Sequence, residues 1–293
     1  MSGRGGPCVA GVPSDTAWPP ARCARYGTGM DERWVMGIDD DPREHRDLDS
    51  VRRLLAGALG ADPELRVASI NALSRVVKEL ENEDVPASRQ AIGEALPRLV
   101  DGLLVEDEGN VDGCTISILR RVRPDWATVD RLLELLPGAR HPELLLEAIK
   151  LHRWEAWPSE IEQIFADHLP IAPYAAGYAL YCGARDLIRL ESTLRALAEA
   201  AGEDRDYWGR HYAITALCVL LGRQELSELA LSLLHELLGS ASERSRKEMA
   251  AALGWASRGD AGDPLLLRLA ADPSAEVRAA AEASQQRAGE RTG

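Results

Sequence analysis

The sequence predicts an all-α protein, a solenoid in which pairs of helices stack on one another. From about residue 48 onward, apolar residues recur three and four positions apart, and Gly, Pro or Asp interrupt them about every 10 to 18 residues. Leu and Ala are abundant and only 5% of the residues are aromatic, which favours helices over strands. The expected pairs begin about every 31 to 37 residues, a period typical of helical repeat proteins.

The expected elements follow from these breaks, taken in order. A first helix at 48–59 comes after a run of acidic residues, which favour a helix N-terminus. Six helix pairs and a closing helix follow, with turns of Gly, Pro or Asp between them. The pairs are expected at 63–80 with 87–104, 111–122 with 125–136, 142–154 with 159–169, 173–182 with 186–200, 206–221 with 224–238, and 243–257 with 264–270, and the closing helix at 274–288.

Stacking is expected because each pair exposes apolar side chains on both flanks, which only a neighbouring pair can cover. The Leu-rich run 132–136 is one such surface, and we expect Leu133→Asp to unfold the array. The Ala-rich run 249–253 carries small side chains that allow two helices to approach closely.

We divide the chain into three parts. Residues 1–38 are rich in Gly, Pro and Arg and lack apolar periodicity, so we expect them to form a disordered leader. Residues 39–289 are expected to form the solenoid, and residues 290–293 a disordered tail.

Charge and cysteine content narrow the possible functions. The formal net charge is −13, which opposes binding to the phosphate backbone of nucleic acid. No stretch is long and apolar enough to span a membrane, and the N-terminus lacks the order of a secretory signal, so we expect a cytoplasmic protein. The bias towards Ala, Arg, Gly and Pro suggests a bacterial source. No cysteines form a CxxC pair, so we expect reduced thiols, the last three of them buried: Cys8, Cys23, Cys114, Cys182 and Cys218.

One motif indicates a family. Residues 272–281 read Asp-Pro-x-x-x-Val-Arg-x-Ala-Ala, and residues 62–73 repeat this run in a weaker form. The motif resembles HEAT repeats, especially the short HEAT-like repeats also found in phycobilisome lyases. The resemblance implies a right-handed solenoid of the armadillo type that binds proteins. It also implies that Asp272 and Arg278, and more loosely Asp62 and Arg66, belong to a ladder of charges between neighbouring repeats.

The middle of the chain is rich in aromatic residues. Tyr174, Tyr178 and Tyr181 share one helix face, as do Trp208 and Tyr212 in the next pair. If these faces are exposed they form an aromatic binding surface, and if they are covered they fill the core between repeats. Both alternatives are open at this point. The candidate partner-binding residues of this group are Trp154, Trp157, Tyr174, Tyr178, Tyr181, Tyr207, Trp208 and Tyr212.

Acidic residues recur on the second helix of successive pairs. Because the resemblance implies that second helices line the concave side, we hypothesise an acidic concave channel for a basic protein partner. The alternative is an ordinary solvated helix face. The candidate binding residues of this group are Asp130, Glu134, Glu162 and Asp167, within a wider set that adds Glu94, Asp101, Glu191, Glu199, Glu225 and Glu228.

These features predict a non-enzymatic scaffold or regulator, for example an immunity-type protein for one partner. We expect it to be monomeric and to need no cofactor and no metal, since His235-Glu236 is the single His-Glu pair where HEAT-type deoxyhypusine hydroxylases use several. The alternative is a HEAT-like enzyme. It would be similar either to DNA glycosylases, with Asp125, Trp126, Trp154 and Trp157 as candidate residues, or to bilin lyases.

Overall fold

The computed structural model describes residues 42–80, 85–104, 111–139, 141–152, 154–202, 206–256 and 263–292. Within these ranges the chain forms helices and no strands, as the sequence predicts. Short 3-10 helices lie at Pro42–His45, Val100–Leu104 and Leu136–Gly138. The α-helices are α2 (Leu48–Ala58), α3 (Pro63–Leu80), α4 (Pro86–Leu99), α5 (Val111–Val122), α6 (Trp126–Leu135), α7 (Pro142–Lys150), α8 (Ser159–Asp167), α9 (Pro173–Gly183), α10 (Glu191–Gly202), α11 (Tyr207–Leu220), α12 (Ser227–Ser240), α13 (Glu243–Ala256), α14 (Asp263–Ala270) and α15 (Ala275–Thr292).

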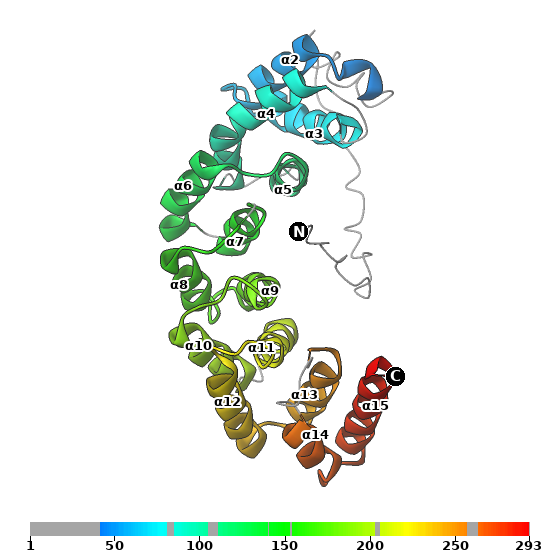
Figure 1. Cartoon of the computed structure of the whole chain (residues 1–293). Helices are drawn as coiled ribbons and strands as arrows, with labels where there is room; N and C mark the ends of the chain where they lie inside the picture. The colour runs from blue at the N-terminus through cyan, green and yellow to red at the C-terminus, as the bar shows by residue number, and fades with distance from the viewer. Residues whose placement is uncertain are drawn as a thin grey trace.

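The helices form a curved array with two layers (Figure 1). The inner layer consists of α3, α5, α7, α9, α11, α13 and α15, each in contact with the next. The outer layer contains α2, α4, α6, α8, α10, α12 and α14. The chain alternates between the layers, so the structure is an all-α solenoid of the HEAT-like kind. The right hand of its superhelix stays a prediction.

The order of the layers corrects one expectation. The first helix of each pair lies on the concave side and the second helix on the convex side, the reverse of what the resemblance implied. Side-chain size gives the physical reason. Neighbouring helices lie closer together on the inside of a curve, and the first helices α9, α11 and α13 carry glycines where they approach their neighbours closely.

Two glycines show how tight the inner layer is. A Cβ atom added at Gly209 of α11 would lie 2.4 Å from the Pro173 Cβ, and one added at Gly254 of α13 would lie 2.9 Å from the Ser284 Cα. Real Cβ atoms do not approach other atoms this closely, so the α9–α11 and α13–α15 contacts require these glycines. The closeness of α9 and α11 sets the geometry of the site described below.

The core runs along the whole array between the two layers. Buried Leu, Ile, Val and Ala side chains form one continuous cluster from Val51 to Ala281. In the Leu-rich run of α6, Leu132 is fully buried, whereas Leu133 is only half-buried, so Leu132 contributes more to the packing. Covering each such Leu contributes about 1.5–3 kcal/mol relative to leaving it exposed.

Side chains explain two of the helix ends that differ from the sequence-based bounds. Helix α7 stops at Lys150 rather than at 154, and the indole Nε1 of Trp154 donates to the Ile149 carbonyl at the helix end (3.2 Å). Helix α10 begins at Glu191 rather than at 186. The backbone N–H groups of Arg189 and Leu190 instead donate to the Glu162 carboxylate, each at 2.8 Å.

The predicted charge ladder is present in a changed form. Asp272 accepts two hydrogen bonds from Arg246 of the preceding inner helix, at 2.7 and 3.2 Å. Arg278 instead donates to the backbone carbonyls of Asp272 and Pro273, and Arg66 likewise donates to the Gly60 carbonyl. The aspartate therefore links neighbouring repeats, while the arginine of the motif holds its own turn.

The remaining expectations concern the chain ends and the cysteines. The expected leader, 1–38, lies outside the described residues. The last helix continues to Thr292, beyond the expected end of the solenoid at 289. Cys218 is buried as predicted and Cys114 is half-buried, but Cys182 is exposed, which corrects the expectation of a buried thiol.

Candidate functional site: an aromatic surface on the concave side

The site is formed by the neighbouring inner helices α9 and α11. Helix α9 contacts α7 and α11 on its flanks and α8 behind it, so its one uncovered face is the concave one. Tyr174, Tyr178 and Tyr181 lie on this face. Together with Tyr207, Trp208 and Tyr212 of α11 they form what we call the concave aromatic surface.

Ring contacts connect the six residues across the two repeats. Tyr212 is 6% exposed and lies among the three tyrosines of α9, with ring centroids 5.8, 5.0 and 5.8 Å from Tyr174, Tyr178 and Tyr181. Trp208 is stacked on Tyr212 at 6.1 Å. Tyr174 and Trp208 remain 47% and 48% exposed. The surface therefore has a buried centre, Tyr212, and an exposed rim that a partner can contact.

A cation lies against the surface on each side. The Lys150 Nζ, at the end of α7, lies 4.0 Å from the centroid of the Tyr178 ring. The Arg244 guanidinium, near the start of α13, lies 4.5 Å from the centroid of the Tyr207 ring. Both are cation–π contacts, which gain strength where water is excluded.

Burial changes the proton affinities of the groups at the surface. Burial lowers the pKa of Lys150, and the nearby Glu147 opposes the change. The pKa of Tyr178 is raised, chiefly by the Cys182 thiol and also by burial. Burial raises the pKa of Tyr212 to about 12. Burial also lowers the pKa of His211, which keeps the imidazole neutral at physiological pH.

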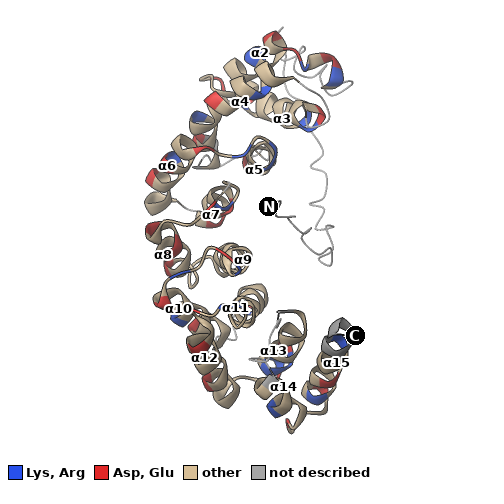
Figure 2. Cartoon of the chain, viewed as in Figure 1, with Lys and Arg blue, Asp and Glu red and all other residues tan. Residues whose placement is uncertain are grey.

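The two helices that carry the surface contribute no exposed charge. Helix α9 contains no Asp, Glu, Lys or Arg, and α11 contains only Arg210, which is buried and paired with Glu248 at 3.3 Å. Figure 2 shows the contrast with the convex layer, where α8 and α12 carry several acidic residues. The concave centre is neutral and aromatic, although the chain as a whole is strongly acidic.

Two of the predicted binding residues are structural. Trp157 is buried, its ring centroid lies 5.1 Å from that of Phe165, and it packs against Gly183. Glu162 is 1% exposed and accepts the two backbone N–H groups ahead of α10. Neither residue can meet a partner, so both predictions were wrong. Sequence periodicity could not separate Trp157 from Trp154, because both follow the end of α7.

The other predicted carboxylates are exposed but lie in the wrong layer. Asp130 and Glu134 belong to α6 and Asp167 to α8, and both helices are in the convex layer. Glu134 is also paired with Arg131 at 2.8 Å. The acidic concave channel is therefore absent from the described concave helices around the site, because it depended on the reversed layer order.

A second aromatic cluster lies where α6 begins and α7 ends. Trp126 and Trp154 meet edge to face with ring centroids 5.3 Å apart, and the His152 ring contacts both. Asp125, a candidate catalytic residue of the glycosylase-like alternative, caps α6 by accepting from the Thr128 N–H (2.8 Å) and hydroxyl (2.6 Å). One carboxylate oxygen, Oδ1, accepts both hydrogen bonds at the helix end, so the structure supports a structural role for Asp125.

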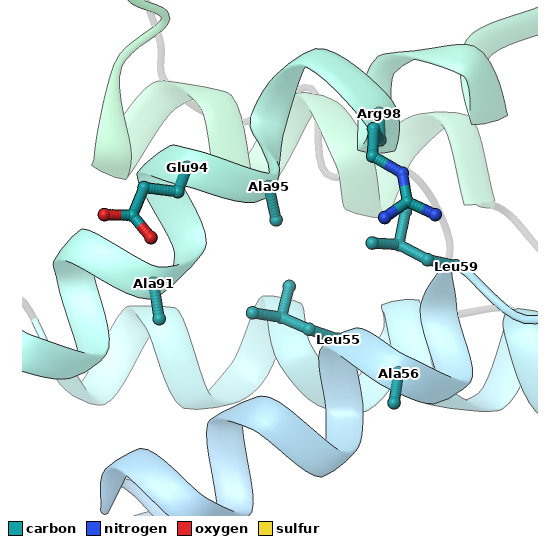
Figure 3. A pocket seen from close by; sticks show the side chains of 7 residues that line it. All are labelled: Leu55, Ala56, Leu59, Ala91, Glu94, Ala95 and Arg98. Carbon is teal, nitrogen blue, oxygen red and sulfur yellow. The ribbon is translucent and has the colours of Figure 1, made fainter.

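Two depressions lie elsewhere on the array. An open groove between α2 and α4 is lined by Leu and Ala, with Glu94 and Arg98 at opposite ends (Figure 3). A deeper pocket of about 420 Å³ lies among α8, α10 and α11, and Asp167, Glu199, Asp206 and Arg210 are among the residues that line it. The Arg210 guanidinium is already paired with Glu248, so neither depression presents a free set of converging polar groups.

Metal and membrane sites were sought in the same parts of the chain. Among the described residues, no three His, Cys, Asp or Glu side chains come together so that they could hold a metal ion. No described helix combines the length and the apolar character needed to cross a membrane.

The fold and the repeat contacts define the class: an α-solenoid built from paired helices with one continuous core. A family model of HEAT repeats matches residues 194–285, from within α10 to within α15. Residues 194–285 therefore match the HEAT-repeat family, and the described helices before them continue the same paired arrangement. No curated protein and no solved structure matches it.

Sequence reasoning missed the charged neighbours of the aromatic surface. Lys150 and Tyr178 are 28 positions apart, and Arg244 contacts Tyr207 from the next inner helix. One signal was present: the four helices that meet here, α7, α9, α11 and α13, each begin one repeat after the one before, so equivalent positions on them had to become neighbours.

Proposed function

We propose that the chain is a non-enzymatic protein-binding scaffold or regulator, and that the concave aromatic surface of α9 and α11 binds its partner. The observation that carries this proposal is the pair of exposed rings, Tyr174 and Trp208, on a surface without exposed charge. Trp and Tyr dominate binding energy at protein interfaces, because their large rigid side chains bury much area at small entropic cost.

The geometry supports a preformed site. The rim residue Trp208 is stacked on the buried Tyr212, which the three tyrosines of α9 hold in place. A rim held in this way loses little conformational freedom on binding, so more of the contact energy remains as affinity. The curved inner layer adds contact area on both sides of the surface.

The kind of partner has to be inferred from other residues than the carboxylates that the sequence suggested. A basic partner was expected from carboxylates on the concave side, but the predicted residues Asp130, Glu134 and Asp167 lie on convex helices. We therefore propose a partner that is apolar where it meets α9 and α11. The scaffold is proposed to act as a monomer in the cytoplasm, and regulation of a single partner, as by an immunity-type protein, fits one localised surface.

Comparative affinity capture from the source cells tests the proposal. The bait is the wild-type chain, a Tyr174→Ala/Trp208→Ala variant, or a Trp126→Ala variant as control. Trp126 is 50% exposed, almost the same as Trp208, but lies in the second aromatic cluster. We expect one protein to be retained by the wild type and the control and lost from the double variant. Equal retention by all three baits, or loss only with Trp126→Ala, would refute the proposed surface.

A further inference from the structure

Two cations border the concave aromatic surface. On the α7 side, Glu147 is paired with Arg120 of α5, and Lys150 has no ion pair among the described residues. Its ammonium is half-buried and its described partner is the ring of Tyr178. The nearby Glu147 carboxylate is paired with Arg120, so the desolvated Lys150 ammonium lacks the dedicated carboxylate that a buried cation normally has.

An accessible cation lies on the α13 side. The Arg244 side chain is 60% exposed, and its guanidinium lies 3.5 Å from the Glu248 carboxylate, which also lies 3.3 Å from the buried Arg210. The other basic residues of α13, Arg246 and Lys247, pair with Asp272 and Glu276. Arg244 is therefore the basic residue of α13 that remains accessible beside Tyr207.

Taken with the proposed function, on which this step depends, these observations point to one kind of partner. We propose that the concave aromatic surface binds an apolar protein segment that carries acidic residues on both sides, one carboxylate meeting the Lys150 ammonium and another meeting the Arg244 guanidinium. The apolar part of the segment covers Tyr174, Tyr178 and Trp208. The complementary charges fix the register of the segment on the surface and speed its association.

The lowered pKa of Lys150 agrees with this arrangement. Burial disfavours the charged ammonium in the free protein, and an incoming carboxylate restores a favourable partner for it. Aromatic rings beside cations also suit nucleic acid, whose bases stack and whose phosphates bind Lys and Arg. A protein segment is favoured because the chain has a net charge of −13 and, among the described residues, two such cations border the surface, too few to hold a phosphate backbone.

Two synthetic peptides of equal length serve as probes. They share the same central Leu and Phe residues, and the flanking residues are Glu in one and Lys in the other. Their dissociation constants are measured by calorimetry at low salt with the full chain, and a single-stranded DNA oligonucleotide is tested in parallel. We expect the Glu-flanked peptide to bind about tenfold more tightly than the Lys-flanked one, because each charge pair lies beside rings that exclude water.

Lys150→Met and Arg244→Met identify the charges responsible. Methionine keeps much of the apolar stem against the ring and removes the charge. Each variant should remove part of the preference for Glu flanks, and the double variant should remove all of it. Lys78→Met, an exposed position on α3, removes one positive charge elsewhere and should leave the preference unchanged.

The outcomes separate this inference from the proposed function. If both peptides bind equally and Trp208→Ala abolishes both, the surface binds proteins but the acidic partner is refuted. Tighter binding of the Lys-flanked peptide, binding of neither peptide, or displacement of the peptides by the oligonucleotide would also overturn the inference. In those three cases the capture experiment above still decides the proposed function on its own.

Discussion

The Tyr178 and Tyr212 rings lie with their centroids 5.0 Å apart and join two neighbouring repeats at the concave face. Tyr178 comes from α9 and Tyr212 from α11, and each ring contacts further rings on its own side. Core and binding surface are therefore continuous here. The aromatic residues fill the space between repeats at their centre and remain exposed at their edge, so each of the two alternatives left open by the sequence describes part of the cluster.

The first prediction separates the centre of the cluster from its rim. Tyr212→Ala should lower the free energy of unfolding by about 3 kcal/mol, because it empties a buried aromatic site. Trp208→Ala should change it by less than about 1 kcal/mol, because half of that side chain is already in water. Urea denaturation of both variants measures the difference. Equal losses would show that Trp208 belongs to the core rather than to a free rim.

The second prediction concerns the close approach of α9 and α11. Gly209→Ala places a Cβ atom 2.4 Å from the Pro173 Cβ, so the two helices must separate. We expect a loss of stability of about 1–3 kcal/mol and weaker partner binding, since the rings of the surface move apart. Gly239→Ala on α12 is the control, because nothing lies within 4 Å of the added Cβ. A Gly209→Ala variant as stable as this control would contradict the described packing.

The third prediction tests the link between the last repeats. Hydrogen bonds from Arg246 hold the pKa of Asp272 below its ordinary value. The stabilisation is therefore present above about pH 4, where the unfolded carboxyl is ionised, and is lost as the pH falls through the lower folded pKa. Asp272→Asn should cost about 2 kcal/mol at pH 7, and the difference from wild type should shrink in acid.

Thermal unfolding at a series of pH values measures this dependence. Glu276→Gln is the matched control, because its partner Lys247 forms an exposed ion pair with it and such pairs contribute little. A difference between Asp272→Asn and wild type that stays constant into acid would show that the carboxylate charge is not what Arg246 binds.

The fourth prediction concerns alkaline pH. The pKa values of Tyr178 and Tyr212 are raised, so the unfolded chain loses these protons before the folded chain does. Their contribution to stability is complete below about pH 10 and is lost as the pH rises towards the folded values. Ultraviolet titration of the folded protein should show a late-ionising component that Tyr178→Phe and Tyr212→Phe each reduce. An unchanged titration curve in both variants would contradict the burial of these phenols.

Much of the fold could be predicted from the sequence, because the helices of a repeat protein carry apolar residues at regular spacing. The spacing of apolar residues placed α3 and α5 at their observed bounds, and the turn residues placed most other helices within a few positions. The largest differences lie at the ends of α4, α7 and α15 and at the start of α10, and those at α7 and α10 arose from Trp154 and Glu162. These side chains bind backbone groups, and the spacing of apolar residues does not indicate such contacts.

The layer order could also have been predicted, from side-chain size. Gly177, Gly209 and Gly254 lie on the first helices of their pairs, where neighbouring inner helices approach most closely. The acidic second helices were assigned to the concave side by resemblance alone. The site itself was predicted in part: the tyrosines of α9 were found by their spacing, whereas Lys150 meets Tyr178 only through the stacking of repeats.

Hydrogen–deuterium exchange of the chain with and without its captured partner tests the central claim most directly. The concave aromatic surface predicts that binding slows amide exchange in α9 and α11, with smaller effects at the end of α7 and the start of α13. The convex helices α8, α10 and α12 should exchange as in the free protein. Protection of those convex helices, with α9 and α11 unchanged, would contradict the account.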